Sequence, residues 1–240
     1  MPASLIDSAI FQGIFSTDAM HHVWSDENRT ARYIDVERAL ARVQARLGLI
    51  PQEACDEIVS HCELAQIDMA RLRQQTERIG YPILGVVTQI NQLCRDKLGE
   101  FVHWGATTQD ITDTATVLQI REGLDIVDSE LEGIAHALAK LCRDHRLTPI
   151  IGRSNLQQAI PVTFGYKMAG ILSAVLRHRE RIAQLRERVL VGEFAGAAEL
   201  QWAHRVIEAA ATAHGAVQLD GRMIDKPVIE RARRLIERAA

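Results

Sequence analysis

Aromatic residues and continuous apolar runs are both scarce in this sequence. Phe, Trp and Tyr together make up 5% of the 240 residues, and no stretch is long and apolar enough to span a membrane. The first residues lack the basic segment and apolar run of a secretory signal peptide. A net charge of −3 gives no bulk attraction to nucleic acid. We therefore expect a cytoplasmic protein without membrane or nucleic-acid partners.

Metal-binding and phosphate-binding motifs are missing too. The four cysteines, Cys55, Cys62, Cys94 and Cys142, include no pair with metal-ligand spacing, and the histidines likewise show none. No glycine-rich phosphate loop and no Ser-His-Asp arrangement is apparent. We expect no metal and no cofactor, and we interpret the cysteines as reduced residues packed in a helical core.

The alternation typical of half-buried strands is absent from the sequence, whereas helical periodicity is pervasive. The longest pattern steps by three and four residues through Val117, Ile120, Leu124, Val127, Leu131, Ile134, Leu138 and Leu141. This seven-residue repeat keeps one stripe on one side of a single helix and requires partner helices along its length. Asp110 or Thr112 can cap its start, and Pro149 follows its end.

A second helix pattern follows, over a span such as Pro161 to Val191. Its stripe comprises Phe164, Met168, Ile171, Val175, His178, Ile182, Leu185 and Val189. Two helices of this length cannot bury both stripes against each other alone. We therefore expect a helical bundle completed by other helices or other copies of the chain, and hence a homo-oligomer.

The whole sequence predicts an all-α fold in three parts. Residues 1–110 form an N-terminal domain of short helices, one of which carries Val36, Leu40, Val43 and Leu47 on one face. Residues 111–198 hold the long helices of a partial bundle. Residues 199–240 form a divergent helix-turn-helix tail.

Two polar segments flank the longest helix pattern. The first, HWGATTQD at 103–110, places an imidazole, two hydroxyls, an amide and a carboxylate around Gly105. Hydroxyls and backbone N–H groups at a helix start can donate to a carboxylate, and His103 can carry a proton at neutral pH. The second, at 152–161, carries the guanidinium of Arg153, a hydroxyl and three amides. Together the two segments favour an anion-binding site. The alternative is that the first segment is only a capped helix start and the second only a structural loop.

Together these motifs resemble the first two signature regions of the fumarase/aspartase superfamily. HWGATTQD before a long helix and GRSNLQQAIPVTFGYKMAG after it stand in the order and at the separation of that superfamily. Residues 16–51, STDAMHHVWSDENRTARYIDVERALARVQARLGLIP, most resemble its branch of 3-carboxy-cis,cis-muconate cycloisomerase and adenylosuccinate lyase. The resemblance covers roughly residues 5–198.

The resemblance implies an all-α subunit whose long helices join those of other subunits in a tetramer. It also implies β-elimination, or its reverse, on a small substrate bearing a fumarate-like dicarboxylate, with one group removing a proton and another assisting the leaving group. When the roles of the superfamily's motif residues are carried over by position, the resemblance implies that His103 is the catalytic residue, either as a substrate ligand or as the general acid. It also implies that Asp110 supports the loop that contains His103. The substrate-binding positions are Thr107, Thr108, Gln109, Asp110, Arg153, Ser154, Asn155 and Gln157.

The chain departs from the superfamily pattern in three places. Many members have a histidine where this second motif has Asn155, and an amide does not transfer protons near neutral pH. The third signature, a Gly-Ser-Ser loop followed by Met-Pro-x-Lys-x-Asn with the catalytic serine, does not occur in the sequence. The resemblance stops near Gly196, and residues 199–240 instead resemble the C-terminal end of citrate-lyase β-subunit-like proteins.

These observations leave two main hypotheses about function. The intact first segment favours an elimination enzyme or cycloisomerase, incomplete in this chain. Asn155 and the missing third signature favour a catalytically inactive helical oligomerisation or binding module that keeps the fold. A third hypothesis, CoA-ester cleavage, rests on the tail alone.

Overall fold

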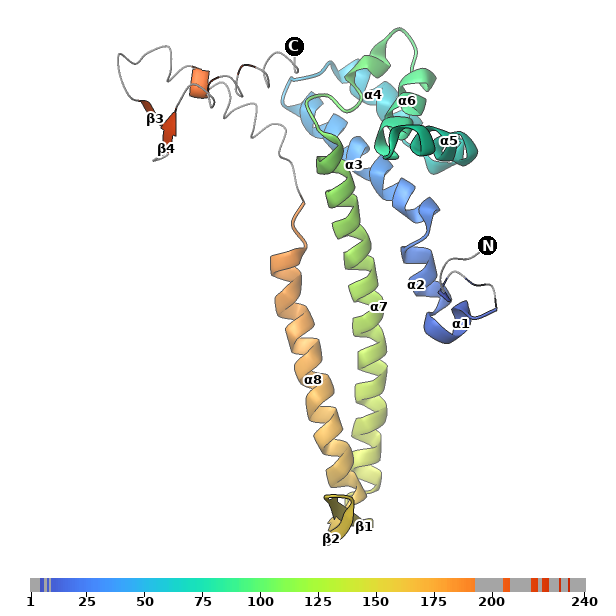
Figure 1. Ribbon diagram of the computed structural model, residues 1–240, viewed down its shortest axis with the longest axis vertical. Coiled ribbons are helices and arrows are strands. Elements are labelled where there is room, and N and C mark those ends of the chain that lie inside the picture. The colour runs from blue at the N-terminus through green and yellow to red at the C-terminus, as the bar shows by residue number, and fades with distance from the viewer. Residues whose placement is uncertain are drawn as a thin grey trace. The chain divides into compact units, whose positions relative to one another are not determined.

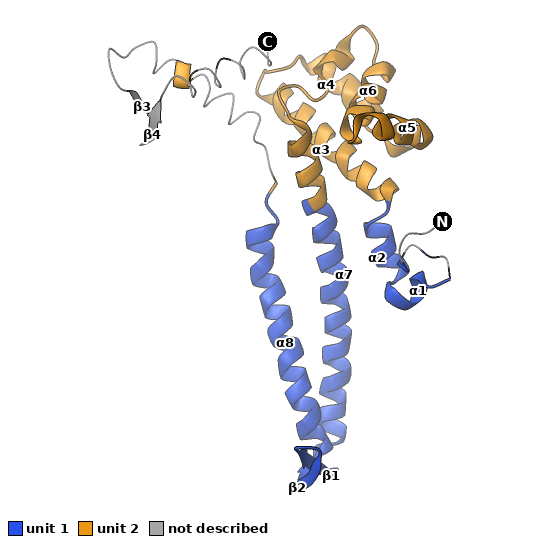
Figure 2. Cartoon of the chain, in the orientation of Figure 1, with its two compact units in different colours: residues 1–25, 117–191 blue, residues 26–116, 192–240 orange. Residues whose placement is uncertain are grey.

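The computed structural model describes residues 10–192 without a gap, together with residues 5, 6, 8, 205–207, 217–219, 222–224, 229 and 233. Its contacts divide the chain into two compact units (Figure 2). Unit 1 comprises Met1–Ser25 and Val117–Val191, and unit 2 comprises Asp26–Thr116 and Gly192–Ala240. The expected division of the sequence at residues 110 and 198 stays a prediction.

Unit 2 is helical throughout its continuous part, residues 26–116. Its elements are α3 (Asp26–Arg46), α4 (Gln52–His61), η1 (Leu64–Gln66), α5 (Met69–Ile79), α6 (Ile83–Leu93), η2 (Leu98–Phe101) and the start of α7 (Thr108–Asp144). Local chemistry sets these bounds: the Asp68 carboxylate accepts the Arg71 N–H at 3.0 Å to cap α5. Gly80, at φ 97°, ends the same helix in the left-handed conformation.

The core of unit 2 is aliphatic, and two of the cysteines belong to it. Ile34, Ile58 and Ile111 are each at most 1% exposed. Cys55 and Cys62 are buried free thiols, as expected. Burial raises the pKa of the Cys62 thiol to about 12, so this side chain stays protonated and packs as a small apolar group.

The buried face of α3 differs from the expected one. Val43 and Leu47 are 41% and 64% exposed. The buried residues of this helix are instead Asn28, Thr30, Tyr33, Ile34, Glu37, Ala41 and Gln44. Val36 and Leu40 of the expected stripe do pack against the core. The rest of the stripe was misassigned because the inner face includes polar Glu37 and Gln44, whose hydrogen-bond partners lie far away in the sequence.

Unit 1 contains α1 (Gln12–Phe15), α2 (Asp18–Val23), most of α7, the strands β1 (Pro149–Ser154) and β2 (Gln157–Thr163), and α8 (Phe164–Val189) (Figure 1). The repeat from Val117 to Leu141 lies within α7, so the prediction of a single uninterrupted helix is confirmed. Gln119, although polar, is buried in unit 1 because its side-chain amide donates to the Val23 carbonyl of α2 at 2.6 Å. The largely helical structure agrees with the predicted all-α class.

Both long helices begin at other residues than expected. Neither Asp110 nor Thr112 is the cap of α7, which starts at Thr108. α8 starts at Phe164 rather than near Pro161, because the Thr163 hydroxyl accepts the Tyr166 N–H at 3.2 Å and caps it there.

The second polar segment is a β-hairpin and not an irregular loop. β1 pairs with β2 antiparallel, with Ile151 opposite Pro161 and Ser154 opposite Gln157. The two turn residues, Asn155 and Leu156, have φ of 51° and 64°, the left-handed pair that a two-residue hairpin turn requires. The sequence did not reveal this turn because leucine rarely adopts that conformation.

The tail of the chain lies largely outside the described residues. The helix-turn-helix expected over residues 199–240 is therefore described only in short pieces. Among these, β3 (Val217–Leu219) and β4 (Arg222–Ile224) pair antiparallel, with Val217 opposite Ile224.

α7 and α8 pack through a small apolar core and flanking ion pairs. Ala135 and Leu138 of α7 meet Met168 and Val175 of α8. Arg179 Nε lies 2.8 Å from Asp128 Oδ1, and Arg186 Nη1 lies 2.7 Å from Asp125 Oδ1. Other residues of the two stripes are exposed: Val127 is 39% exposed, Ile134 47% and Ile171 46%. A homo-oligomer that covers these residues remains a prediction.

Gly165 is expected to tolerate no side chain. A Cβ there would lie 2.7 Å from the Cys142 carbonyl oxygen and 2.9 Å from Arg146 Cα, both backbone atoms. Gly165→Ala should therefore lower the free energy of unfolding by about 1–3 kcal/mol, measured by denaturant titration followed by circular dichroism.

Gly170, in the same helix, provides the matched control. Nothing lies within 4 Å of a Cβ at Gly170, so Gly170→Ala should raise stability by about 0.5–1 kcal/mol through helix propensity. Equal effects of the two substitutions would contradict the close approach of α7 and α8 at Gly165.

The Asp128–Arg179 pair should make stability depend on pH. The hydrogen bond from Arg179 holds the pKa of the Asp128 carboxyl below its usual 3.8. The contribution of this ion pair to the free energy of unfolding is therefore present above pH 3.8 and is lost as the pH falls through the lowered pKa. Asp128→Asn should lower the denaturant midpoint at pH 7, and this effect should shrink as the pH falls further below 3.8. Glu130→Gln, an exposed neighbour on α7, should change neither midpoint.

Candidate functional site

The first polar segment is a tight turn between η2 and α7. His103 and Gly105 have φ of 62° and 66°, and the His103 carbonyl accepts the Ala106 N–H at 3.2 Å. The Gln44 side chain donates to the Trp104 carbonyl at 2.6 Å. This hydrogen bond from α3 holds the turn in place from a helix that lies some 60 residues earlier in the chain.

His103, the candidate catalytic residue, contacts a buried carboxylate. Its Nδ1 lies 2.5 Å from Oε1 of Glu37, whose side chain is 1% exposed, whereas that of His103 is 20% exposed. Glu37 was not singled out from the sequence, because it contacts a residue 66 positions away. A carboxylate on the inner face of a helix is nevertheless a recognisable signal, since such a group is almost always paired.

The remaining predicted residues of this segment form the start of α7. Asp110 is fully buried, and its Oδ2 accepts the Thr107 N–H at 2.8 Å. This is the carboxylate half of a capping box, so the Asp110 side chain faces the turn and not the solvent. Its predicted contact with substrate stays a prediction. Thr107 and Gln109 are exposed, and Gln109 donates to Asp113 at 3.1 Å. Thr108 is half-buried. The two hydroxyls and the positive end of a long helix suit a carboxylate ligand.

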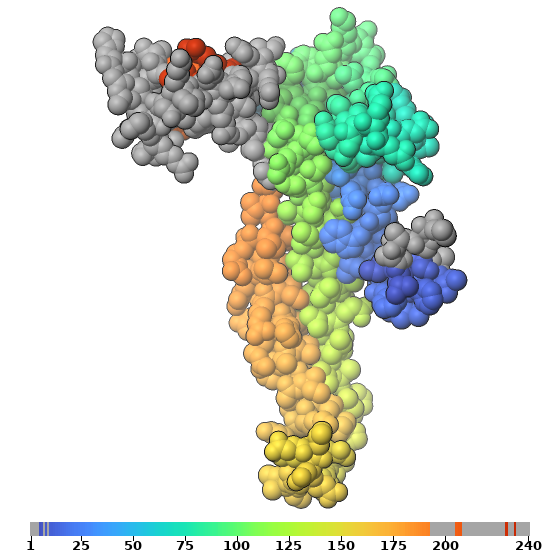
Figure 3. All heavy atoms as spheres, in the orientation of Figure 1, coloured from blue at the N-terminus to red at the C-terminus, as the bar shows by residue number. Residues whose placement is uncertain are grey.

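The residues of the second segment all lie on the hairpin of unit 1. Arg153 and Ser154 end β1, Asn155 is in the turn, and Gln157 begins β2. All four side chains are exposed, and the space-filling view shows the yellow hairpin projecting beyond the α7–α8 pair (Figure 3). The hairpin thus presents a guanidinium, a hydroxyl and amides to the surroundings, a set that can bind an anion.

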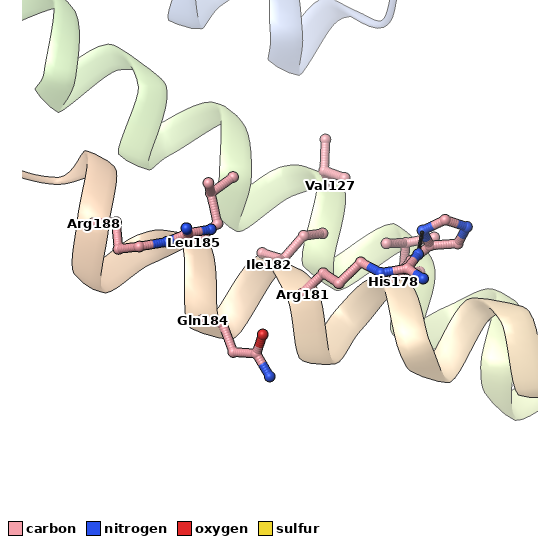
Figure 4. Close-up of a pocket in the computed structure, with 8 residues that line it drawn as sticks. Val127, His178, Arg181, Ile182, Gln184, Leu185 and Arg188 are labelled. Atoms are coloured by element: carbon pink, nitrogen blue, oxygen red, sulfur yellow. Dashed lines mark hydrogen bonds between the residues drawn. The ribbon is translucent and has the colours of Figure 1, made fainter.

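Unit 1 also carries an open groove of about 430 Å³ along α7 and α8 (Figure 4). It is lined by Val127, Leu131, His178, Arg181, Ile182, Gln184, Leu185 and Arg188. Its apolar floor is part of the uncovered stripe. Across the described ranges, no three His, Cys, Asp or Glu side chains converge in a way that could hold a metal ion. None of the helices in those ranges combines the length and apolar character needed to cross a bilayer.

The fold and the turn at the start of α7 define a helical subunit of the fumarase/aspartase type. The comparisons with known proteins agree. Residues 13–221 match the family described as Lyase. The chain therefore belongs to this lyase family, within the fumarase/aspartase superfamily.

Three relatives illustrate the match. The chain is 53% identical over 195 residues to trans-aconitate decarboxylase 1 of Mycosarcoma maydis, covering 81% of the chain and 40% of that protein. It is 40% identical over 197 residues to N-acetyl-S-(2-succino)cysteine lyase of Dickeya dadantii, covering 82% and 43%. The crystal structure of 3-carboxy-cis,cis-muconate lactonizing enzyme from Pseudomonas putida superposes with a TM-score of 0.75 at 37% identity, covering 79% and 44%.

The three relatives carry different reactions in their names, so the family does not by itself define the reaction of this chain. The chain spans about two fifths of the length of the relatives it matches. The family match extends to residue 221, beyond the point near Gly196 where the resemblance was expected to stop.

Leu156 should be replaceable by glycine with a gain in stability. Its side chain is 96% exposed and its φ is 64°, so Leu156→Gly removes left-handed strain without losing packing. We expect a gain of about 1 kcal/mol in the free energy of unfolding. Ile160→Gly, at an exposed position of β2, is the control and should destabilise the hairpin. A loss in both variants would show that Leu156 makes stabilising contacts.

Proposed function

We propose that the chain takes part in β-elimination, or the reverse addition, on a substrate with a fumarate-like dicarboxylate. Ring closure of a muconate is the same addition within one molecule. The observation that best supports this proposal is the turn before α7. There the His103 imidazole is paired with a buried carboxylate, and a helix start with an exposed and a half-buried threonine follows. The relatives named for succinylated cysteine and for muconate support the same substrate class.

In this proposal each residue of the turn has a distinct role. Thr107, Thr108 and Gln109 bind one substrate carboxylate through side chains and free N–H groups of the first turn of α7. His103 binds the substrate or protonates the leaving group. Asp110 accepts the Thr107 N–H and keeps the turn in shape, so its carboxylate repels the substrate less than a free one would.

The hairpin supplies the second wall of the proposed site, through Arg153, Ser154, Asn155 and Gln157. The turn and the hairpin belong to different units of the chain. We propose that they meet in a site formed between copies of the chain, because the superfamily resemblance implies a tetramer. The exposed residues Val127, Ile134 and Ile171 of α7 and α8 also favour a homo-oligomer.

A second candidate is a binding module without catalysis. The specific observation in its favour is Asn155, an exposed amide in the hairpin turn, at a position where many superfamily members carry a histidine. The Asn155 amide can donate a hydrogen bond that orients a substrate carboxylate. It cannot act as a general acid or base near neutral pH.

Turnover and binding together distinguish the two candidates. The purified chain is incubated with N-acetyl-S-(2-succino)cysteine, 3-carboxy-cis,cis-muconate and trans-aconitate while ultraviolet absorbance is recorded. Fumarate release or muconate loss supports elimination or cycloisomerisation. Decarboxylation without either of these contradicts the elimination proposal and shows that the chain catalyses another reaction. Fumarate binding without turnover supports the binding module, and absence of both contradicts both candidates.

Thr108→Val is expected to weaken fumarate binding about fivefold, because one hydrogen bond to the carboxylate, worth about 1 kcal/mol, is lost. Titration calorimetry measures the change. The control is Thr116→Val, an exposed threonine of the same helix whose hydroxyl donates to the Thr112 carbonyl, and it should leave the Kd unchanged. Equal affinities of both variants would remove Thr108 from the proposed site.

A further inference from the structure

Glu37 is a buried carboxylate whose position is explained by a single partner. It lies in the middle of α3, and its side chain is 1% exposed. Its Oε1 is 2.5 Å from Nδ1 of His103. Among the residues that the structure describes, His103 makes the only hydrogen bond or ion pair to this carboxylate.

The neighbouring charged groups are engaged elsewhere. Arg38, next in the chain, donates to the Cys62 carbonyl and pairs with Asp35 at 3.1 Å and Glu63 at 3.3 Å. Cys62 lies close enough for the Glu37 charge to contribute to its raised pKa, but burial holds that thiol protonated. Within the described residues, the His103 imidazole is thus the hydrogen-bond partner of the buried carboxylate.

The chemistry of the pair determines which ring nitrogen is available. An ionised carboxylate can only accept hydrogen bonds, so Nδ1 of His103 carries the hydrogen. In the neutral imidazole, Nε2 then has the free lone pair, and in the protonated ring Nε2–H is the proton to be given away. His103 also has a φ of 62°, a backbone conformation that leaves its side chain dependent on such an anchor.

We propose that Glu37 is a positioning residue that holds His103 in its Nδ1–H tautomer and presents Nε2 as the proton-transferring or substrate-binding atom. The role of the tautomer in the reaction rests on the proposed function, whereas the tautomer itself does not. Glu37 acts through the imidazole and touches no substrate. Its carboxylate orients the ring and offsets the positive charge that the ring gains when Nε2 binds a proton.

The decisive measurement is the tautomer of His103 in the whole chain. Long-range ¹⁵N–¹H correlation spectra of the ¹⁵N-labelled protein at neutral pH distinguish a protonated from an unprotonated ring nitrogen, and comparison with His103→Gln identifies the signals. The wild-type chain should show Nδ1–H with a free Nε2. A wild-type His103 in the Nε2–H form would overturn the proposal even if no variant folds.

Substitutions at Glu37 then test the cause. Glu37→Gln removes the obligate acceptor with little change in shape, and its spectrum should lose the pure Nδ1–H pattern. Glu37→Asp keeps a carboxylate, so its spectrum should retain part of the Nδ1–H pattern. The matched control is Glu63→Gln, which removes an exposed carboxylate paired with Arg38 and should leave His103 unchanged. An unaltered His103 pattern in folded Glu37→Gln would overturn the proposal.

Kinetics separate this proposal from the proposed function. If the chain turns over a dicarboxylate substrate, Glu37→Gln should lower kcat about 10- to 100-fold with less than about a threefold change in KM. Unchanged kcat together with a lost tautomer would refute positioning for catalysis. A Glu37-dependent tautomer in a chain that neither binds nor converts dicarboxylates would support the pair and refute the proposed function.

Discussion

The uncovered apolar stripe of α7 is the constraint on which the other features depend. A helix of 37 residues with a seven-residue repeat can bury that repeat only against helices of similar length. The chain supplies one, α8, and the two bury four residues well, Ala135, Leu138, Met168 and Val175. The ion pairs of Arg179 and Arg186 fix the register of this pair but leave Val127 and Ile134 facing outward. The same stripe is the basis for the prediction that several copies assemble through the long helices.

The two candidate segments are held rigidly by different means. The turn before α7 is anchored by buried polar groups, since Gln44, Glu37 and Asp110 each bond to it from the interior. The hairpin is held by its own strand pairing and by the close approach at Gly165. The supports of the turn are buried, whereas the hairpin is exposed on both faces and is stabilised by its strand pairing.

Local patterns predicted what depends on local physics, and long-range contacts account for what was missed. The repeat from Val117 to Leu141 specified one helix because periodicity and helix geometry are set by the same residues. The hairpin was missed because its turn uses Leu156 in an unusual conformation and both of its faces are exposed. Glu37 could not be identified because nothing within its own helix indicates a histidine 66 residues later. The superfamily could be recognised because its motifs adjoin the long helix.

The burial of the thiols has a bearing on chemical resistance. A thiol adds to an activated double bond as the thiolate, and burial raises the pKa of Cys62 to about 12 and that of Cys94 to about 11. Because the thiolate forms only at high pH, we expect Cys62 and Cys94 to react slowly with alkylating electrophiles at neutral pH.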